Sequence, residues 1–190
     1  MIRFKLLLAT TLFLSYICCT CGYRYFYWRE YTGTIPSDAI VAGRDISGKD
    51  LYIGQAYVKN GGWQVVPIYQ GIKEAIAVLN GPKKTDKYIK ILCGEQNHLR
   101  WVVTTAKDFH EDMEDKVGVI GGHEDGWGET HIGRISYEGE TRIGKVNSFR
   151  TGKANFYFHD RGTERDIGDN YLFEVLYYND DYVIEPRSLH

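Results

Sequence analysis

The segment His123-Glu-Asp-Gly-Trp-Gly-Glu-Thr-His131 holds the densest group of side chains that could bind a metal. A His-Glu-x-x-His motif on a helix places both imidazoles on one face, but the spacing here differs, and the glycines at positions 126 and 128 interrupt a helix. A calcium loop needs alternating oxygen ligands and a closing glutamate, which this segment lacks. We therefore expect no metal site and no cofactor.

A second group of acidic residues could do acid–base chemistry, because paired carboxylates hydrolyse glycosidic bonds. It consists of Asp160, Glu164, Asp166 and Asp169. Arginines alternate with these acids, a pattern that favours a solvated hairpin. Nucleophile-elbow, Walker and Gly-x-Gly-x-x-Gly motifs in the required context are absent from the chain. We expect no catalytic residues and predict that the protein is not an enzyme.

The composition favours strands joined by glycine turns. Of the 190 residues, 15 are tyrosine, 8 phenylalanine, 4 tryptophan and 21 glycine, and only 4 are proline. Aromatic side chains are enriched in strands, and glycine supplies the backbone angles that tight turns need. The length suits one domain with a substantial hydrophobic core.

Residues 1–21 have the layout of a secretory signal peptide: Arg3 and Lys5, an apolar run over 6–17, and small residues around position 21. The apolar run is shorter than the roughly 20 residues that a membrane span requires, so an uncleaved anchor is the weaker alternative. Cleavage near Cys21 would leave 21 basic against 25 acidic residues. We therefore expect a secreted, extracellular protein that neither binds nucleic acid nor inserts into a membrane.

The same cleavage would leave Cys93 as the one cysteine of the mature chain. A disulfide framework is then excluded. Cys93 follows Ile91-Leu92, which favours a buried small hydrophobe. An intermolecular disulfide, or a bridge to Cys21 if the cut falls before it, are the alternatives.

The chain contains an internal repeat. Val41-Ala-Gly-Arg-Asp45 matches Ile120-Gly-Gly-His-Glu124, and Ile53-Gly54 matches Ile132-Gly133 at the same interval of 79 residues. Further along, Ile89–Leu92 matches Phe173–Leu176 at 84 residues. In each copy a glycine turn (Gly43, or Gly121-Gly122) precedes four predicted strands, and a helical turn is expected between the copies at 107–116. The strands are predicted at 51–57, 63–69, 75–79 and 88–93, and at 130–137, 141–149, 154–159 and 171–177.

These residues resemble the DM-nine repeat family, which includes invertebrate mannose-binding lectins and the amino-terminal module of natterin-like toxins. The resemblance covers about Trp28 to Tyr178. It rests on the ordered set Ile35-Pro36, Ala39, Gly43-x-Asp45, Leu51-Tyr-Ile-Gly54, Gly144-Lys-Val146, Gly162-Thr-Glu164 and Phe173-Glu-Val-Leu176.

The resemblance implies an all-β fold in which two tandem DM-nine-type repeats pack as one pseudo-twofold antiparallel domain. The domains are expected at 1–21 (signal peptide), 22–105 (first repeat), 106–178 (second repeat) and 179–190 (C-terminal tail). Homodimers occur in the family, so a second copy is an expected partner. The chain is too short for the additional domain of natterin-like relatives and is not expected to form pores.

Some family members bind mannose through an acidic residue in the first glycine turn and the lysine of the Gly-Lys-Val segment. Carried over, this implies a site at Glu124 and Lys145 in the second copy. In the first copy Asp45 matches the acid, but the same spacing reaches Val66, so the lysine is missing. A carboxylate accepts hydrogen bonds from vicinal sugar hydroxyls and an ammonium donates to them. Trp127 could stack on a pyranose face.

The resemblance therefore predicts a secreted lectin that recognises mannose-type glycans and acts in innate defence. The alternative is an interaction scaffold that uses the same repeats to bind a protein and no sugar. The missing lysine at Val66 favours this alternative.

Overall fold

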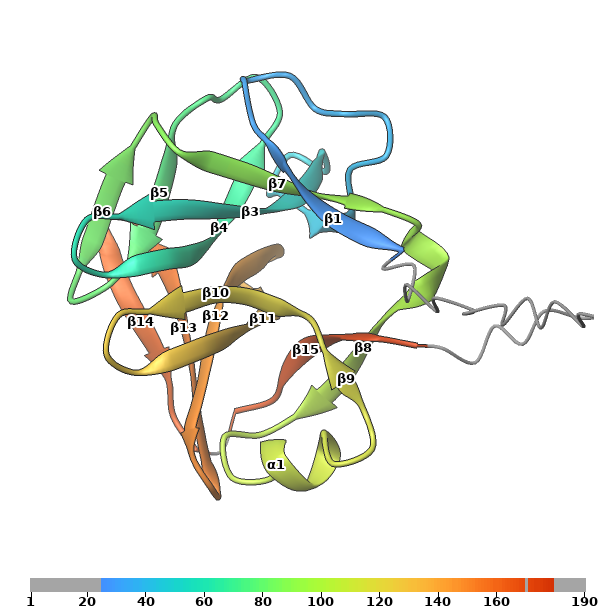
Figure 1. Ribbon diagram of the computed structural model, residues 1–190, viewed down its shortest axis with the longest axis vertical. Coiled ribbons are helices and arrows are strands. Elements are labelled where there is room, and N and C mark those ends of the chain that lie inside the picture. Colours follow the sequence, from blue (N-terminus) through green and yellow to red (C-terminus); the bar gives the residue numbers. More distant parts are fainter. Residues whose placement is uncertain (1–24, 170, 180–190) are drawn as a thin grey trace, which may run out of the picture.

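The computed structural model describes residues 25–169 and 171–179, and the expected signal peptide lies outside them. The described part of the chain is almost entirely β-strand, which confirms the all-β prediction (Figure 1). We call the strands before residue 95 the first strand set and the later ones the second strand set. The two sets occupy the upper and the lower part of Figure 1.

The first strand set consists of β1 (Phe26–Glu30), β2 (Val41–Arg44), β3 (Asp50–Val58), β4 (Gly62–Tyr69), β5 (Ala75–Val78), β6 (Pro82–Thr85) and β7 (Ile89–Gly94). A 3₁₀ turn (Gln96–His98) leads to the second set. It consists of β8 (Leu99–Thr104), β9 (Val117–Gly118), β10 (Ile120–Glu124), β11 (Gly128–Tyr137), β12 (Glu140–Arg150), β13 (Lys153–Asp160), β14 (Thr163–Ile167) and β15 (Phe173–Tyr178). The helix α1 (Phe109–Asp112) lies within the expected helical turn.

Thirteen strands form one antiparallel sheet system, and β5 and β6 form a separate hairpin. In the first set β3 pairs with β2, β4 and β7, and β7 pairs with β1. In the second set β11 pairs with β10, β12 and β15, and β15 pairs with β8. The two sets join where His123 of β10 pairs with Trp63 of β4.

The register of these pairs also recurs along the chain. Each residue pair between β2 and β3 returns 79 positions later between β10 and β11, and both ladders shift register at the same place. The matching pairs are Val41 with Tyr52 and Ile120 with His131, Gly43 with Leu51 and Gly122 with Thr130, and Arg44 with Asp50 and His123 with Glu129.

Buried side chains gather in three clusters. One lies in the first set around Val66, Ile68 and Ile91, and another in the second set around Phe156, Phe158 and Val175. The largest draws residues from both sets, among them Ile53, Ile132 and Leu176. The third cluster holds the two sets together, because its members alternate along strands of both and point to one shared interior.

The expected glycine turns are strands in the structure. Gly43 lies in β2, and Gly121 and Gly122 lie in β10. Glycine is required there by close approach: a Cβ on Gly43 would lie 2.1 Å from Thr141 Oγ1, and one on Gly122 would lie 2.2 Å from the Trp63 carbonyl oxygen. The turn prediction was wrong because a glycine in a strand also marks a site where another segment packs closely.

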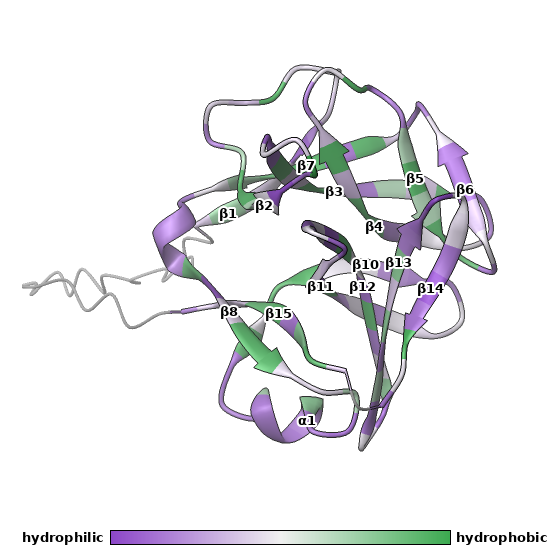
Figure 2. Ribbon diagram, turned by 180° about the vertical axis from the view of Figure 1, so that it is seen from behind, coloured by the Kyte–Doolittle hydropathy of each residue, from purple (hydrophilic) through white to green (hydrophobic). Residues whose placement is uncertain are grey.

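The acidic segment forms the expected hairpin, made by β13 and β14. Figure 2 colours β14 and β6 mainly hydrophilic and β5 mainly hydrophobic, as their sequences imply. Asp160 departs from the solvated picture, because it is only 1% exposed and accepts a hydrogen bond from Arg142 at 3.0 Å. A buried carboxylate needs such partners, and the neighbouring arginines supply them.

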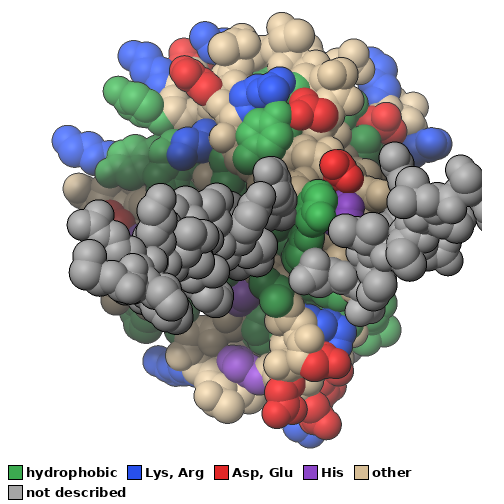
Figure 3. Space-filling view, turned by 45° about the vertical axis from the view of Figure 1, so that its right-hand side comes forward, with side chains coloured by type: hydrophobic (Ala, Val, Ile, Leu, Met, Phe, Trp, Pro, Cys, Tyr) green, Lys and Arg blue, Asp and Glu red, His purple; other side chains and the backbone are tan. Residues whose placement is uncertain are grey.

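Charges of both signs are mixed over the face shown in Figure 3, with acidic side chains gathered at its lower end. On that face the described residues form no continuous basic surface. Within the same residues, no helix has the length and apolar character needed to cross a membrane.

Candidate functional site

Glu124 and Lys145 lie in direct contact. Glu124 ends β10, and Lys145 lies in the middle of β12, where it pairs with Ile132 on one side and Tyr157 on the other. The Lys145 Nζ donates to Glu124 Oε1 and forms an ion pair with it. The two residues are only 2% and 7% exposed. The structure thus brings together the two residues that the sequence predicted for the second site.

Two amides complete this buried pair. Gln64 of β4 accepts a hydrogen bond from Lys145 Nζ through its Oε1 at 3.0 Å and donates through Nε2 to the Gly61 carbonyl at 2.7 Å. Asn147 Nδ2 donates to Glu124 Oε1 at 3.2 Å. The Lys145 Nζ also lies 5.6 Å from the centre of the Tyr157 ring. The first strand set therefore contributes Gln64 to a site whose charges come from the second set.

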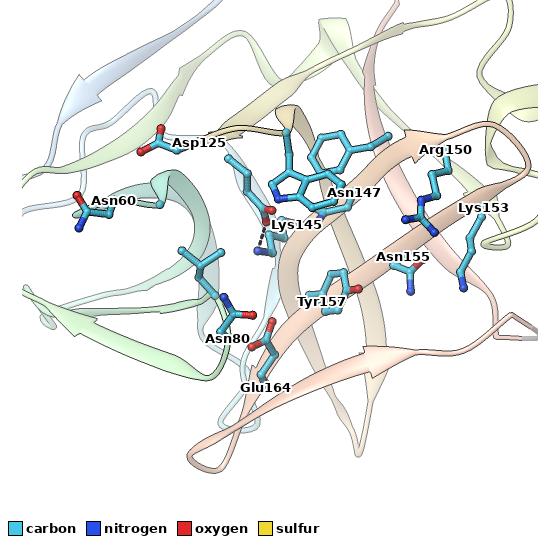
Figure 4. A pocket seen from close by; sticks show the side chains of 15 residues that line it. Asn60, Asn80, Asp125, Lys145, Asn147, Arg150, Lys153, Asn155, Tyr157 and Glu164 are labelled. Carbon is cyan, nitrogen blue, oxygen red and sulfur yellow. Dashed lines mark hydrogen bonds and ion pairs between the residues drawn. The ribbon is translucent and has the colours of Figure 1, made fainter.

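The network forms part of the wall of a pocket of about 470 Å³. Figure 4 shows the lining side chains converging from β12 and β13 on one side and from the loops of the first set on the other. The lining residues are Asn60, Gly61, Leu79, Asn80, Glu124, Asp125, Trp127, Lys145, Asn147, Phe149, Arg150, Lys153, Asn155, Tyr157 and Glu164. Most can donate or accept hydrogen bonds, so the pocket suits a polar ligand.

Trp127 supplies an aromatic surface to this pocket. It lies in the turn between β10 and β11, where Gly126 and Gly128 have φ of +81° and +133°. Those angles favour glycine, and they allow a tight turn that displays the indole. Trp127 is 65% exposed and stacks on Phe149, with ring centroids 5.9 Å apart. An exposed indole beside polar side chains has the composition of a surface on which sugar rings stack.

Asp45 lies outside this pocket. Its Oδ1 accepts hydrogen bonds from the Ser47 hydroxyl at 2.7 Å, the Ser47 N–H at 2.8 Å and the Lys49 N–H at 3.0 Å. The hydrogen bond from the Ser47 hydroxyl is the main cause that lowers the pKa of the Asp45 carboxyl. Asp45 therefore stabilises its own turn, and the third predicted site residue is not brought to the other two.

The register changes the residue that corresponds to Lys145 in the first set. Ile53 and Ile132 match in the repeat; Ile132 pairs with Lys145, whereas Ile53 pairs with Pro67. Counting along the chain had pointed to Val66, one residue earlier and fully buried. The count was wrong by one because the β3–β4 connection is longer than the β11–β12 connection. Pro67 has no side-chain donor, so the first set lacks the cation.

The histidines of the 123–131 segment do not converge. His123 is exposed on β10, whereas His131 is partly buried on β11, where burial lowers the pKa of its imidazole. Within residues 25–169 and 171–179, no group of three or more His, Cys, Asp or Glu side chains could hold a metal ion.

Cys93 is fully buried in the first set, as expected of a small apolar residue. Burial raises the pKa of its thiol to about 11, so the thiol is protonated at neutral pH.

Sequence reasoning missed the polar residues that surround the pair. Asn147 and Phe149 follow Lys145 at intervals of two along β12, and Asn155 and Tyr157 alternate along β13. Alternation on neighbouring strands places side chains on one face, so this pattern could have identified them. Gln64 gave no such signal, because its contact with Lys145 depends on how the two sets pack.

No family model matches the chain, and no curated protein resembles it in sequence. The fold is shared with the crystal structure of the nematode sperm cell motility protein MFP2B, with a TM-score of 0.54 and 11% sequence identity. The likeness covers 80% of this chain and 44% of the other. The chain thus spans less than half the length of that protein. At this identity the likeness shows a common all-β fold and nothing of function.

Proposed function

We propose that this protein is a secreted, lectin-like recognition protein that binds mannose-type glycans in the pocket beside Glu124 and Lys145. The observation that carries the proposal is the contact between these two residues at a pocket that also displays Trp127. The DM-nine resemblance, which names the same two residues, supports it. The proposal includes no catalytic step and no cofactor.

The recurring strand register supports the DM-nine assignment itself. Contacts between the two strand sets are reciprocal: Gln55 Nε2 donates to the Gly121 carbonyl at 2.8 Å, and Arg134 donates to the Ala42 carbonyl at 2.6 Å. Gln55 and Arg134 are 79 residues apart, and so are Ala42 and Gly121. We infer from this exchange that the strand sets are two DM-nine-type repeats related by a pseudo-twofold axis.

The chemistry of the pocket suits a sugar. Glu124 and the amides of Asn147 and Asn155 offer the acceptors and donors that sugar hydroxyls require. Because Lys145 and Glu124 are already paired, the hydroxyls need not separate two bare charges. The exposed face of Trp127 supplies an apolar surface for the C–H face of a pyranose.

Single lectin sites are weak, so recognition of a surface requires several sites in reach of one another. With one complete site in each chain, a homodimer would supply two. This arrangement suits innate defence, where repeated glycans on a surface are the target.

The test is isothermal titration calorimetry with a mannose oligosaccharide on the purified protein and its Trp127→Ala variant. Trp127 is exposed, so its removal leaves the fold intact and should weaken binding about tenfold through lost stacking. Tyr171→Ala is the matched control, because Tyr171 is 64% exposed and does not line the pocket.

A second variant, Glu124→Gln with Lys145→Met, removes both charges together. Exchange of a complete buried pair for groups of similar volume often costs little stability, so this variant should fold and fail to bind. Unchanged affinity in both pocket variants would refute the sugar site.

A protein-interaction scaffold is the second candidate function. The MFP2B neighbour, a motility protein, favours it. It predicts no response to any glycan on an array and a specific protein partner in a pull-down that survives Trp127→Ala.

A further inference from the structure

We propose that the pocket prefers glycans that carry an anionic group, a carboxylate or a sulfate ester, over neutral mannose. Arg150 and Lys153 at its edge would hold that group. This inference rests on the proposed function, because it names the ligand class of the same pocket.

The first observation is the position of the two cations. Arg150 ends β12 and Lys153 begins β13, and they are paired directly across the hairpin. Both are exposed and both line the pocket. Like charges directly opposite one another on adjacent strands destabilise a hairpin. An arrangement that costs stability in the free protein becomes favourable when an anion lies between the two side chains.

The second observation is that neither cation is neutralised. Within residues 25–169 and 171–179, no carboxylate forms an ion pair with Arg150 or Lys153. The other arginines near this hairpin behave differently, because Arg142 and Arg165 both pair with Asp160. The nearby Asp166 carboxylate instead accepts hydrogen bonds from the Asn155 amide at 3.2 and 3.3 Å.

The third observation is the separation of charge within the pocket. Figure 4 shows Arg150 and Lys153 together at one end, with Asp125 and Asn60 at the other and Glu164 beside Asn80. The Glu164 carboxylate accepts a hydrogen bond from the Gly81 N–H at 2.5 Å. Lys145 is engaged by Glu124 and Gln64. The cationic capacity left for a ligand is therefore at the Arg150 end.

These positions define how an acidic sugar would bind. Its ring would stack on Trp127, its hydroxyls would meet Asn155 and the Glu124 network, and its anionic group would lie between Arg150 and Lys153. A guanidinium makes two parallel hydrogen bonds to a carboxylate or a sulfate, which gives direction as well as attraction. A neutral mannose would leave both cations hydrated and gain nothing from them.

The experiment compares three oligosaccharides of equal length by calorimetry on the full protein: neutral mannose, mannuronate and sulfated mannose. We expect one or both acidic ligands to bind about tenfold more tightly than the neutral one at low salt. The advantage should shrink at high salt, because exposed charges are screened. Whether the mannuronate or the sulfated arm gains more identifies the anion.

Arg150→Gln with Lys153→Gln should abolish the advantage and leave neutral binding unchanged, since both side chains are exposed and carry no fold contact. Lys107→Gln is the control, an exposed lysine outside the pocket. Equal binding of neutral and acidic ligands by the wild-type protein would overturn the preference and leave the lectin proposal standing. An advantage that persists in the double variant would also overturn it. Failure of all three ligands would overturn both proposals.

Discussion

The two strand sets share one backbone register but differ at the position where a sugar site would form. In the second set Glu124 contacts Lys145, and the pair lines a pocket. In the first set Asp45 caps its own turn, and Pro67 stands where the lysine would be. A duplicated framework can thus keep its fold while one copy loses the chemistry.

A third residue explains why the two positions diverge. Gln64 pairs with Ala56, and Arg142 pairs with Ile135, 79 residues after Ala56, so Gln64 and Arg142 are equivalent in the register. Gln64 reaches across to Lys145 at 3.0 Å. Arg142 instead pairs with Glu140 at 2.8 Å and Asp160 at 3.0 Å within its own set. The complete site therefore depends on a residue of the opposite set, and the first set does not receive the equivalent contact.

The largest expected difference between the sets is the effect of removing the cation. Lys145→Ala should lower the free energy of unfolding by about 3–5 kcal/mol, because it leaves the buried Glu124 carboxylate without its partner. Pro67→Ala, at the equivalent position, should cost at most about 1 kcal/mol. Urea denaturation measures both values. Similar losses in the two variants would mean that the ion pair contributes nothing particular to the second set.

A smaller difference is expected between the two glycines of the matching strands. An alanine at 122 would meet the Trp63 carbonyl oxygen at 2.2 Å, and one at 43 would meet the Thr141 side chain at 2.1 Å. Backbone moves less easily than a side chain, so Gly122→Ala should cost about 2–3 kcal/mol and Gly43→Ala about 1 kcal/mol.

Thermal unfolding of both glycine variants measures this contrast. Thr141→Ser combined with Gly43→Ala should recover part of the loss, since it removes the γ-methyl group that would lie 2.7 Å away. A larger loss for Gly43→Ala than for Gly122→Ala would contradict the expectation.

Alternating patterns and the repeat predicted the fold well, including β3, β4, β11, β12 and the helical turn that holds α1. Short polar strands such as β6 and β14 were not predicted as strands, because their residues are exposed and carry no alternating signal. The Glu124–Lys145 pair could be named from the resemblance. Gln64 and the Pro67 correspondence could not be predicted, since both depend on sheet register and on how the strand sets pack.

The smallest effect concerns Asp45 and its dependence on pH. Its carboxyl pKa is lowered, chiefly by the Ser47 hydroxyl, so the charged form stabilises the turn. That stability is present above the pKa of an ordinary carboxyl group and is lost as the pH falls through the lowered value. Asp45→Asn should therefore reduce the urea midpoint slightly near neutral pH, converge with the wild type in acid, and leave glycan affinity unchanged. Asp50→Asn, an exposed neighbour on β3, is the control. A deficit of equal size at every pH would show that the charge of Asp45 is not what stabilises this turn, and a loss of glycan binding would return Asp45 to the recognition site.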